Sequence, residues 1–161
     1  YGLQFEVNEN TLIPRPETEE LVEWIIESQK SKVQSQKLEI LDIGTGTGCI
    51  PISLKTNLLQ ANVSAIDVSE KALEVAKRNA QSNKVEVNFI QTNILEVEDL
   101  NQHFDIIVSN PPYVRNLEKQ EIKKNVLDYE PHLALFVEDT DALLFYRKIA
   151  QLALENLSPN G

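Results

Sequence analysis

The chain has 161 residues, which is long enough for one domain with a hydrophobic core. Its 42% hydrophobic and 25% charged residues are ordinary for a globular protein, and no apolar run approaches the roughly 20 residues that a membrane-spanning helix needs. A formal net charge of -10 argues against tight binding to a nucleic-acid backbone, and a single cysteine with two distant histidines predicts neither an internal disulfide nor a metal site.

Residues 1–37 are predicted to form an N-terminal segment followed by a helix. Pro14 and Pro16 favour an extended approach, and Pro16 suits the first turn of a helix over residues 17–30. The apolar positions that recur at helical spacing are Leu21, Val22, Ile25 and Ile26. Residues 31–37 are polar and are expected to link this helix to the core of the domain.

Strand-like and helix-like segments alternate over the core, residues 38–161. The predicted elements are a strand over 38–43, a helix over 47–57, a strand over 62–67, a helix capped by Ser69, a strand carrying Val85, Val87 and Phe89, a strand over 104–109 and a helix over about 141–156. This order is typical of an α/β fold with a parallel sheet and flanking helices, whose ligands bind at the carboxyl ends of the strands. Residues 158–161 are a turn signal where a fifth strand is expected, so we expect a sheet truncated after the fourth strand and its following helix.

A glycine-rich turn, Gly44-Thr45-Gly46-Thr47-Gly48, directly follows the first predicted strand. Glycines at alternate positions allow a tight turn and a close approach of the backbone to a ligand, and the helix behind them directs its positive dipole end toward a carboxylate. The spacing differs from the G-x-G-x-x-G of dinucleotide-binding proteins. It resembles the first motif of class I methyltransferases, which implies that these five residues bind S-adenosylmethionine.

Residues at the other strand ends complete the predicted cofactor site. Asp67 ends the second strand, where a carboxylate accepts hydrogen bonds from ribose hydroxyls, and its alternative role in helix capping is already served by Ser69. Val68 is expected to pack on the adenine face, and Ile94 to supply an apolar wall and a backbone N–H. For Asp42 two roles stay open: it reaches the amino group of the ligand, or it holds the loop.

The fourth predicted strand ends in Ser109-Asn110-Pro111-Pro112-Tyr113. Prolines lack N–H groups, so this stiff exit leaves the carbonyls of Asn110 and Pro111 free to accept hydrogen bonds, while Asn110 adds a side-chain acceptor and Tyr113 an aromatic face. Two acceptors can hold the hydrogens of a planar NH2 group and stabilise the charge that develops on its nitrogen during methylation. We therefore interpret Asn110, Pro111 and Tyr113 as catalytic. A rigid Pro-Pro turn is the alternative, but such a turn does not require the flanking Asn and Tyr.

Together these motifs resemble the HemK/PrmC family, the peptide chain release factor glutamine methyltransferases, over nearly the whole chain. The motifs are Leu12-Ile13-Pro14-Arg15-Pro16-Glu17-Thr18-Glu19, residues 41–48, residues 109–113, and Tyr129-Glu130-Pro131 before Leu133-Ala134-Leu135. The tetrapeptide over residues 110–113 is shared with adenine-N6 methyltransferases, whereas the stretch over residues 13–19 favours the glutamine enzymes.

The resemblance implies a Rossmann-like class I fold and S-adenosylmethionine as the cofactor, with Asn110 contacting both cofactor and substrate. The implied substrate is the glutamine amide of the Gly-Gly-Gln motif in release factors, contacted by Asn110, Pro111, Pro112 and Tyr113. The family also implies a helical N-terminal domain and three further strands that this chain lacks. A cytoplasmic protein is expected, which suits the lone Cys49.

Two other functions stay open from the sequence. One is an adenine-N6 methyltransferase acting on DNA or RNA, against which the acidic charge counts because nucleic-acid binding favours a basic face. The other is a cofactor-binding fragment without turnover. The long polar segment from Arg115 to Thr140, which follows the catalytic turn, is predicted to be a mobile substrate flap.

Overall fold

The computed structural model describes residues 2–29, 37–112, 114–115, 136–137 and 141–161. Four parallel strands form the main sheet in the spatial order β3-β2-β1-β4. They are β1 (Glu39–Ile43), β2 (Asn62–Asp67), β3 (Asn88–Gln91) and β4 (Ile106–Ser109). A separate parallel pair joins β5 (Val114–Arg115) to β6 (Phe136–Val137). The parallel sheet confirms the α/β class predicted from the alternation of elements.

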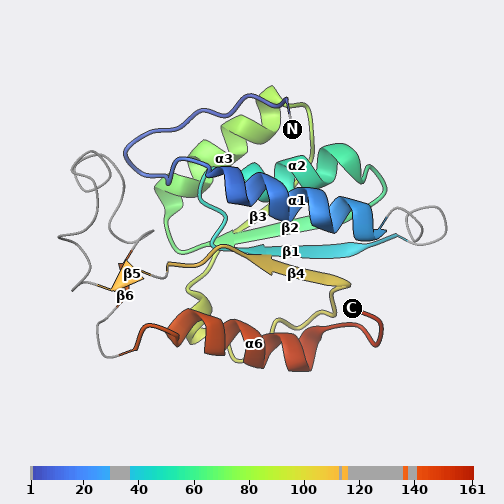
Figure 1. Ribbon diagram of the computed structural model, residues 1–161, viewed down its shortest axis with the longest axis vertical. Coiled ribbons are helices and arrows are strands. Elements are labelled where there is room, and N and C mark those ends of the chain that lie inside the picture. Colours follow the sequence, from blue (N-terminus) through green and yellow to red (C-terminus); the bar gives the residue numbers. More distant parts are fainter. Residues whose placement is uncertain (1, 30–36, 113, 116–135, 138–140) are drawn as a thin grey trace.

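Helices cover both faces of the main sheet. The helices α1 (Pro16–Gln29), α2 (Cys49–Asn57) and α3 (Glu70–Ser82) lie on one face, and α6 (Leu144–Asn156) lies on the other (Figure 1). The short 3-10 helix η1 (Ile94–Glu96) follows β3. None of the described helices combines the length and the hydrophobicity that a bilayer crossing needs.

Two hydrophobic clusters hold these layers together, one on each face of the sheet. Side chains alternate along a strand, so Ile40 of β1 packs with Leu54 of α2 on one side, while Leu41 and Ile43 pack with Leu152 of α6 on the other. Because both faces are covered, the strand appears in the sequence as a continuous apolar run. Asp42 interrupts this run and is fully buried.

The helix starts largely follow the capping signals in the sequence. α1 begins at Pro16, one residue before its predicted start, with the proline in the first turn. As predicted, the hydroxyl of Ser69 caps α3 by accepting a hydrogen bond from the N–H of Ala72 at 3.2 Å. The predicted start of α2 at residue 47 is wrong by two residues, because Gly48 has a left-handed φ of 78° that no helical residue adopts. Pro51 then lies in the first turn, where a missing N–H is tolerated.

The third strand is displaced from its predicted position. Lys84 has a φ of 57°, and the N–H groups of Lys84 and Val85 donate to the carbonyls of Gln81 and Ala80. These two bonds form a Schellman motif, with lysine in the left-handed position that glycine usually occupies. The alternating Val85 and Val87 therefore belong to the helix end and its exit, and only Phe89 falls within β3.

Two further elements, β4 and α6, are shorter than predicted. β4 begins at Ile106 because Phe104 pairs with Leu157 instead, with its N–H donating to the carbonyl of Asn156 at 2.8 Å. α6 begins at Leu144 after a turn in which the N–H of Leu144 donates to the carbonyl of Asp141. Residues 158–161 form the predicted turn, closed by a 2.8 Å hydrogen bond.

Candidate active site at the switch point of the sheet

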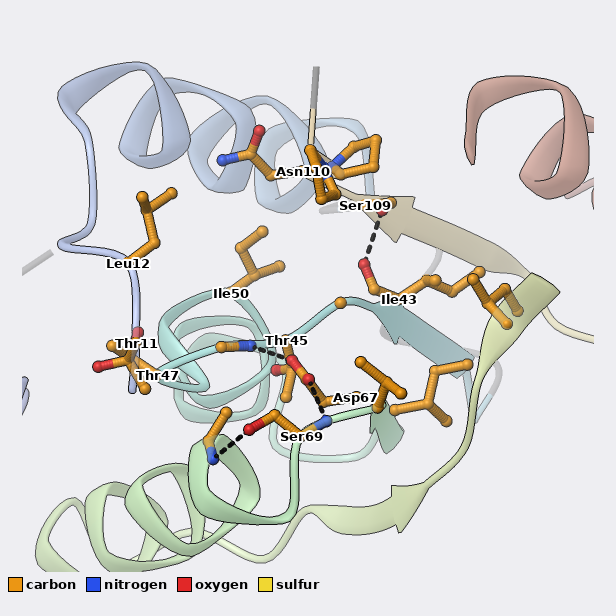
Figure 2. A pocket seen from close by; sticks show the side chains of 18 of the residues that line it. Thr11, Leu12, Ile43, Thr45, Thr47, Ile50, Asp67, Ser69, Ser109 and Asn110 are labelled. Carbon is orange, nitrogen blue, oxygen red and sulfur yellow. Dashed lines mark hydrogen bonds between the residues drawn. The ribbon is translucent and has the colours of Figure 1, made fainter. Parts of the chain in front are cut away.

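A pocket of about 350 Å³ opens at the carboxyl ends of the strands. The strand order reverses between β1 and β4, since β2 and β3 lie on one side of β1 and β4 on the other, and ligands bind at such a switch point. The hydroxyl of Ser109 at the end of β4 donates to the carbonyl of Ile43 at the end of β1, at 2.6 Å (Figure 2). This bond fixes the two loops that carry the predicted motifs next to each other.

The glycine loop forms the floor of the pocket. The N–H groups of Gly44 and Thr45 donate to the carbonyl of Ile66 in β2, at 2.9 and 3.1 Å. Gly44 and Gly46 have φ values of +76° and +54°, and a Cβ built at either position would meet no atom within 4 Å. Their missing side chains therefore leave open space at the pocket, as a closely approaching ligand requires.

Gly48 has a different role from the other two glycines. It does not line the pocket, and a Cβ at this position would lie 3.0 Å from Ile52 Cδ1 and 3.1 Å from Ala76 Cβ. The third glycine therefore permits α2 and α3 to pack closely behind the loop. Thr45 and Thr47 do line the pocket, together with Cys49 at the start of α2.

Asp67 binds the glycine loop to the start of α3. One carboxylate oxygen accepts a hydrogen bond from the N–H of Gly46, and the other accepts one from the N–H of Ser69, both at 2.9 Å (Figure 2). Sequence reasoning placed Asp67 at the cofactor site but did not foresee these two contacts. A carboxylate can accept about four hydrogen bonds, so its capacity toward a ligand is not exhausted.

Asp42 lies beneath the loop, outside the set of residues that line the pocket. In the described part of the chain neither of its carboxylate oxygens has a hydrogen-bond partner, and the same holds for the hydroxyl of Thr45. Burial raises the pKa of Asp42 to about 7, and the nearby Thr45 hydroxyl opposes this rise although it does not meet hydrogen-bond geometry. The negative charge of Asp67 adds to the rise. Burial likewise raises the pKa of the neighbouring Cys49 to about 11, so this thiol is neutral.

Apolar side chains form the wall beyond β2 and β3. Val68 is exposed at 44% of its surface, whereas Ile94 in η1 is buried, and both line the pocket. Asn93 caps η1 by accepting a hydrogen bond from the N–H of Leu95 at 3.2 Å, which holds Ile94 in place. The sequence did not indicate that Phe145 of α6 would contribute to this wall.

The predicted catalytic turn lies directly opposite the glycine loop. Asn110, Pro111 and Pro112 all line the pocket, and Asn110 follows β4 immediately (Figure 2). Tyr113 lies outside the described residues, as does most of the flap predicted between residues 115 and 140. The structure thus brings the first three residues of the tetrapeptide together with the loop and with Asp67.

One wall of the pocket was not assigned from the sequence. It is formed by residues 10–15 of the N-terminal segment and by Thr18 of α1. A local turn positions it: the N–H of Thr11 donates to the carbonyl of Asn8 at 3.1 Å, and the buried Thr11 hydroxyl bonds to the same carbonyl. The proline-rich motif over residues 12–19, one of the motifs that carry the family resemblance, was the available signal.

Comparison with known proteins agrees with this geometry. Residues 23–133 match the model of the methyltransferase small domain. The chain is 70% identical to the release factor glutamine methyltransferase of Flavobacterium psychrophilum and 48% identical to that of Bacteroides thetaiotaomicron, over 100% and 99% of its own length. It spans 56% of the length of each of these relatives.

The solved structures show the same fold. The human methyltransferase 10 domain containing protein superposes with a TM-score of 0.66 at 21% identity, covering 97% of this chain and 68% of the human one. The fold is therefore the Rossmann-like class I methyltransferase fold, and the predicted HemK/PrmC resemblance is confirmed at the level of sequence. On the match over residues 23–133, the chain belongs to the methyltransferase small-domain family.

Proposed function

We propose that this chain is the catalytic core of an S-adenosylmethionine-dependent methyltransferase. Its proposed substrate is the side-chain amide of glutamine in the Gly-Gly-Gln motif of peptide chain release factors. Support for the substrate comes from the relatives, which are named release factor glutamine methyltransferases. Because that reaction serves translation, we place the protein in the cytoplasm.

The residues of the pocket fit the proposed cofactor. Gly44 and Gly46 leave open space where a side chain would stand, so the ligand can approach the backbone of the loop closely. Asp67 would accept hydrogen bonds from the ribose hydroxyls, and Val68 and Ile94 would enclose the adenine ring. When bound, S-adenosylmethionine supplies an electrophilic methyl group that the amide nitrogen attacks in line.

Catalysis by the protein itself would consist of holding and polarising the amide. The lone pair of an amide nitrogen is delocalised, so the nitrogen is a poor nucleophile until it is positioned and its developing charge is stabilised. The side-chain oxygen of Asn110 would accept one NH2 hydrogen, and a backbone carbonyl of Asn110 or Pro111 would accept the other. Pro112 and Tyr113 would contact the amide plane, and the proton can leave after the methyl group is transferred.

The observation that carries the proposal is the meeting of three motifs in one pocket. The glycine loop after β1, Asp67 after β2 and Asn110 after β4 all lie at the carboxyl edge of the sheet, and the bond between Ser109 and Ile43 holds the first and third together. A turn with no chemical role would not need to face a glycine-lined space.

The test is methyl transfer from radiolabelled S-adenosylmethionine to two substrates in parallel: a release factor with an intact Gly-Gly-Gln motif, and an adenine-containing oligonucleotide. We expect label only in the release factor. A release factor in which that glutamine is replaced by glutamate serves as the matched control and should stay unlabelled. Label in the oligonucleotide alone would contradict the proposed substrate.

A further inference from the structure

The buried side chain of Asn79 in α3 bonds to two segments that are distant in the sequence. Its Oδ1 accepts a hydrogen bond from the N–H of Glu6 at 2.7 Å, and its Nδ2 donates to the carbonyl of Glu6 at 3.0 Å and to the carbonyl of Thr47 at 2.9 Å. Both amide hydrogens are therefore used. At 2% exposure, Asn79 is among the least accessible polar residues of the described chain.

The two partners of Asn79 lead to two different parts of the pocket. Thr47 is part of the glycine loop, and its carbonyl lies before the helix cap Gly48, so it has no partner within α2. Glu6 lies in the N-terminal segment that runs along α3 and continues into the wall formed by residues 10–15 (Figure 1). One side chain thus joins the floor of the pocket to the wall formed by residues 10–15.

Two neighbours of Asn79 bind the same N-terminal segment without reaching the loop. The guanidinium of Arg78 donates to both carboxylate oxygens of Glu6, at 2.8 and 3.0 Å, and Nδ2 of Asn83 donates to the carbonyl of Gln4 at 2.9 Å. Both contacts are exposed to solvent, so the Arg78–Glu6 ion pair contributes little. Nδ2 of Asn83 also donates to the backbone carbonyl of Asn79 at 2.9 Å, which does not involve the side chain of Asn79. Arg78 and Asn83 offer matched controls that loosen the segment and leave the Thr47 contact intact.

We propose that Asn79 is a positioning residue that holds the glycine loop in its cofactor-binding conformation by joining it to the N-terminal segment. This inference rests on the proposed function, because it takes the loop to be the cofactor site. Only an amide fits the position: it supplies two donors to two carbonyls and one acceptor to an N–H. A carboxylate would face the carbonyls of Glu6 and Thr47 without a donor, and an alanine would leave the buried carbonyl of Thr47 unpaired.

The experiment measures the dissociation constant for S-adenosylmethionine by calorimetry in the wild type, Asn79→Ala, Arg78→Gln and Asn83→Ala. We expect at least a tenfold increase for Asn79→Ala and a change within twofold for the two controls. In methyl transfer, the KM for S-adenosylmethionine should rise in Asn79→Ala, while kcat at saturation stays within about threefold. A merely structural defect would lower kcat through the loss of active protein and leave that KM unchanged.

Three results would overturn the inference. Equal affinity in Asn79→Ala and the wild type would refute this inference and leave the proposed function intact. Equal weakening in all three variants would assign the loss of affinity to the N-terminal segment as a whole. A wild type that does not bind S-adenosylmethionine would defeat the proposed function as well. If Asn79→Ala does not fold, hydrogen exchange of the wild type provides the test. Bound S-adenosylmethionine should slow exchange at the amides of Glu6 and Gly46 together. Protection of Gly46 alone would overturn the proposed coupling between the N-terminal segment and the glycine loop.

Discussion

Asn110 is the residue on which the substrate side of the proposed site depends. Asn110→Ala deletes an acceptor and leaves one NH2 hydrogen of the substrate unpaired in a closed pocket. Losing one such transition-state contact costs about 3–4 kcal/mol, or roughly 100- to 1,000-fold in kcat. The measurement is methyl transfer to a release factor, with folding checked by circular dichroism.

The control for this variant is Asn88→Ala, which removes an exposed amide at the start of β3 and should keep wild-type turnover. A folded Asn110→Ala protein within threefold of the wild type would show that this acceptor does not contribute to catalysis.

A second prediction concerns Asp42 and the dependence of stability on pH. The pKa of Asp42 is about 7 in the folded chain, above its ordinary value of 3.8, so between these values the folded state binds more protons than the unfolded state. The contribution of Asp42 to stability therefore falls as pH rises from about 4 to about 7, by an amount on the order of 4 kcal/mol. Asp42→Asn removes this dependence, because an amide does not titrate.

The measurement is the free energy of unfolding in urea across that pH range. The stability of Asp42→Asn relative to the wild type should increase with pH and level off above pH 7. Asp99→Asn, which changes an exposed carboxylate, is the control and should show no such trend. Parallel curves for Asp42→Asn and the wild type would show that the carboxyl is not buried in solution.

Sequence position alone brought most of the predicted site residues to one pocket, because parallel strands must bring their carboxyl ends to one edge. It could not reveal that Asp67 also binds the N–H groups of Gly46 and Ser69, since those contacts depend on how the loop bends. Nor could it place residues 10–15, because the motif over residues 12–19 does not reveal by itself that an extended segment returns across α3 to the pocket.

At the scale of elements, we expect alanine at Gly48 to affect mainly stability and alanine at Gly46 to affect mainly ligand binding. Alanine at either position is strained by a positive φ, at about 1–2 kcal/mol. Gly48→Ala additionally forces contacts of 3.0 and 3.1 Å with Ile52 and Ala76, so it should destabilise the protein further by separating α2 from α3. Gly46→Ala meets open space and should instead weaken S-adenosylmethionine binding.

Each glycine variant serves as the control for the other. Urea unfolding should rank Gly48→Ala as the less stable of the two, and calorimetry should rank Gly46→Ala as the weaker binder. The reverse order in both measurements would mean that Gly48 faces the ligand and that Gly46 lies between the helices, contrary to our assignment.

Element boundaries were predictable where a capping side chain or a proline marks them, as at Pro16 and Ser69. They were missed where the determining feature is a backbone dihedral. Lys84 adopts a left-handed φ although lysine seldom does so, and this choice ends α3 and delays β3 to Asn88. The start of α2 was predicted two residues too early for a related reason. A glycine in the sequence shows that a positive φ is possible, but not that the backbone adopts it.

For the molecule as a whole, the pocket is an assembly of segments from both ends of the described chain. Its walls come from the N-terminal segment, from the ends of all four strands of the main sheet and from α6. A ligand that contacts all of them must stabilise the entire fold, because such contacts exist only in the folded state. The expected gain is RT ln(1 + [L]/Kd), which is about 2.7 kcal/mol at a concentration one hundred times Kd.

This stabilisation gives the last prediction. For a domain of this size, saturating S-adenosylmethionine should raise the midpoint of thermal unfolding by roughly 5–10 °C. Asp67→Ala should lose most of the shift at the same concentration, because it removes charge-assisted hydrogen bonds to the ribose worth about 2–3 kcal/mol. It also releases the N–H groups of Gly46 and Ser69, so its midpoint without ligand should fall as well. The decisive quantity is therefore the shift within each protein, measured by scanning calorimetry, with the exposed Asp99→Ala as the control that keeps the full shift. An undiminished shift in Asp67→Ala would exclude this carboxylate from the ribose site and leave it only the structural role that the loop contacts already show.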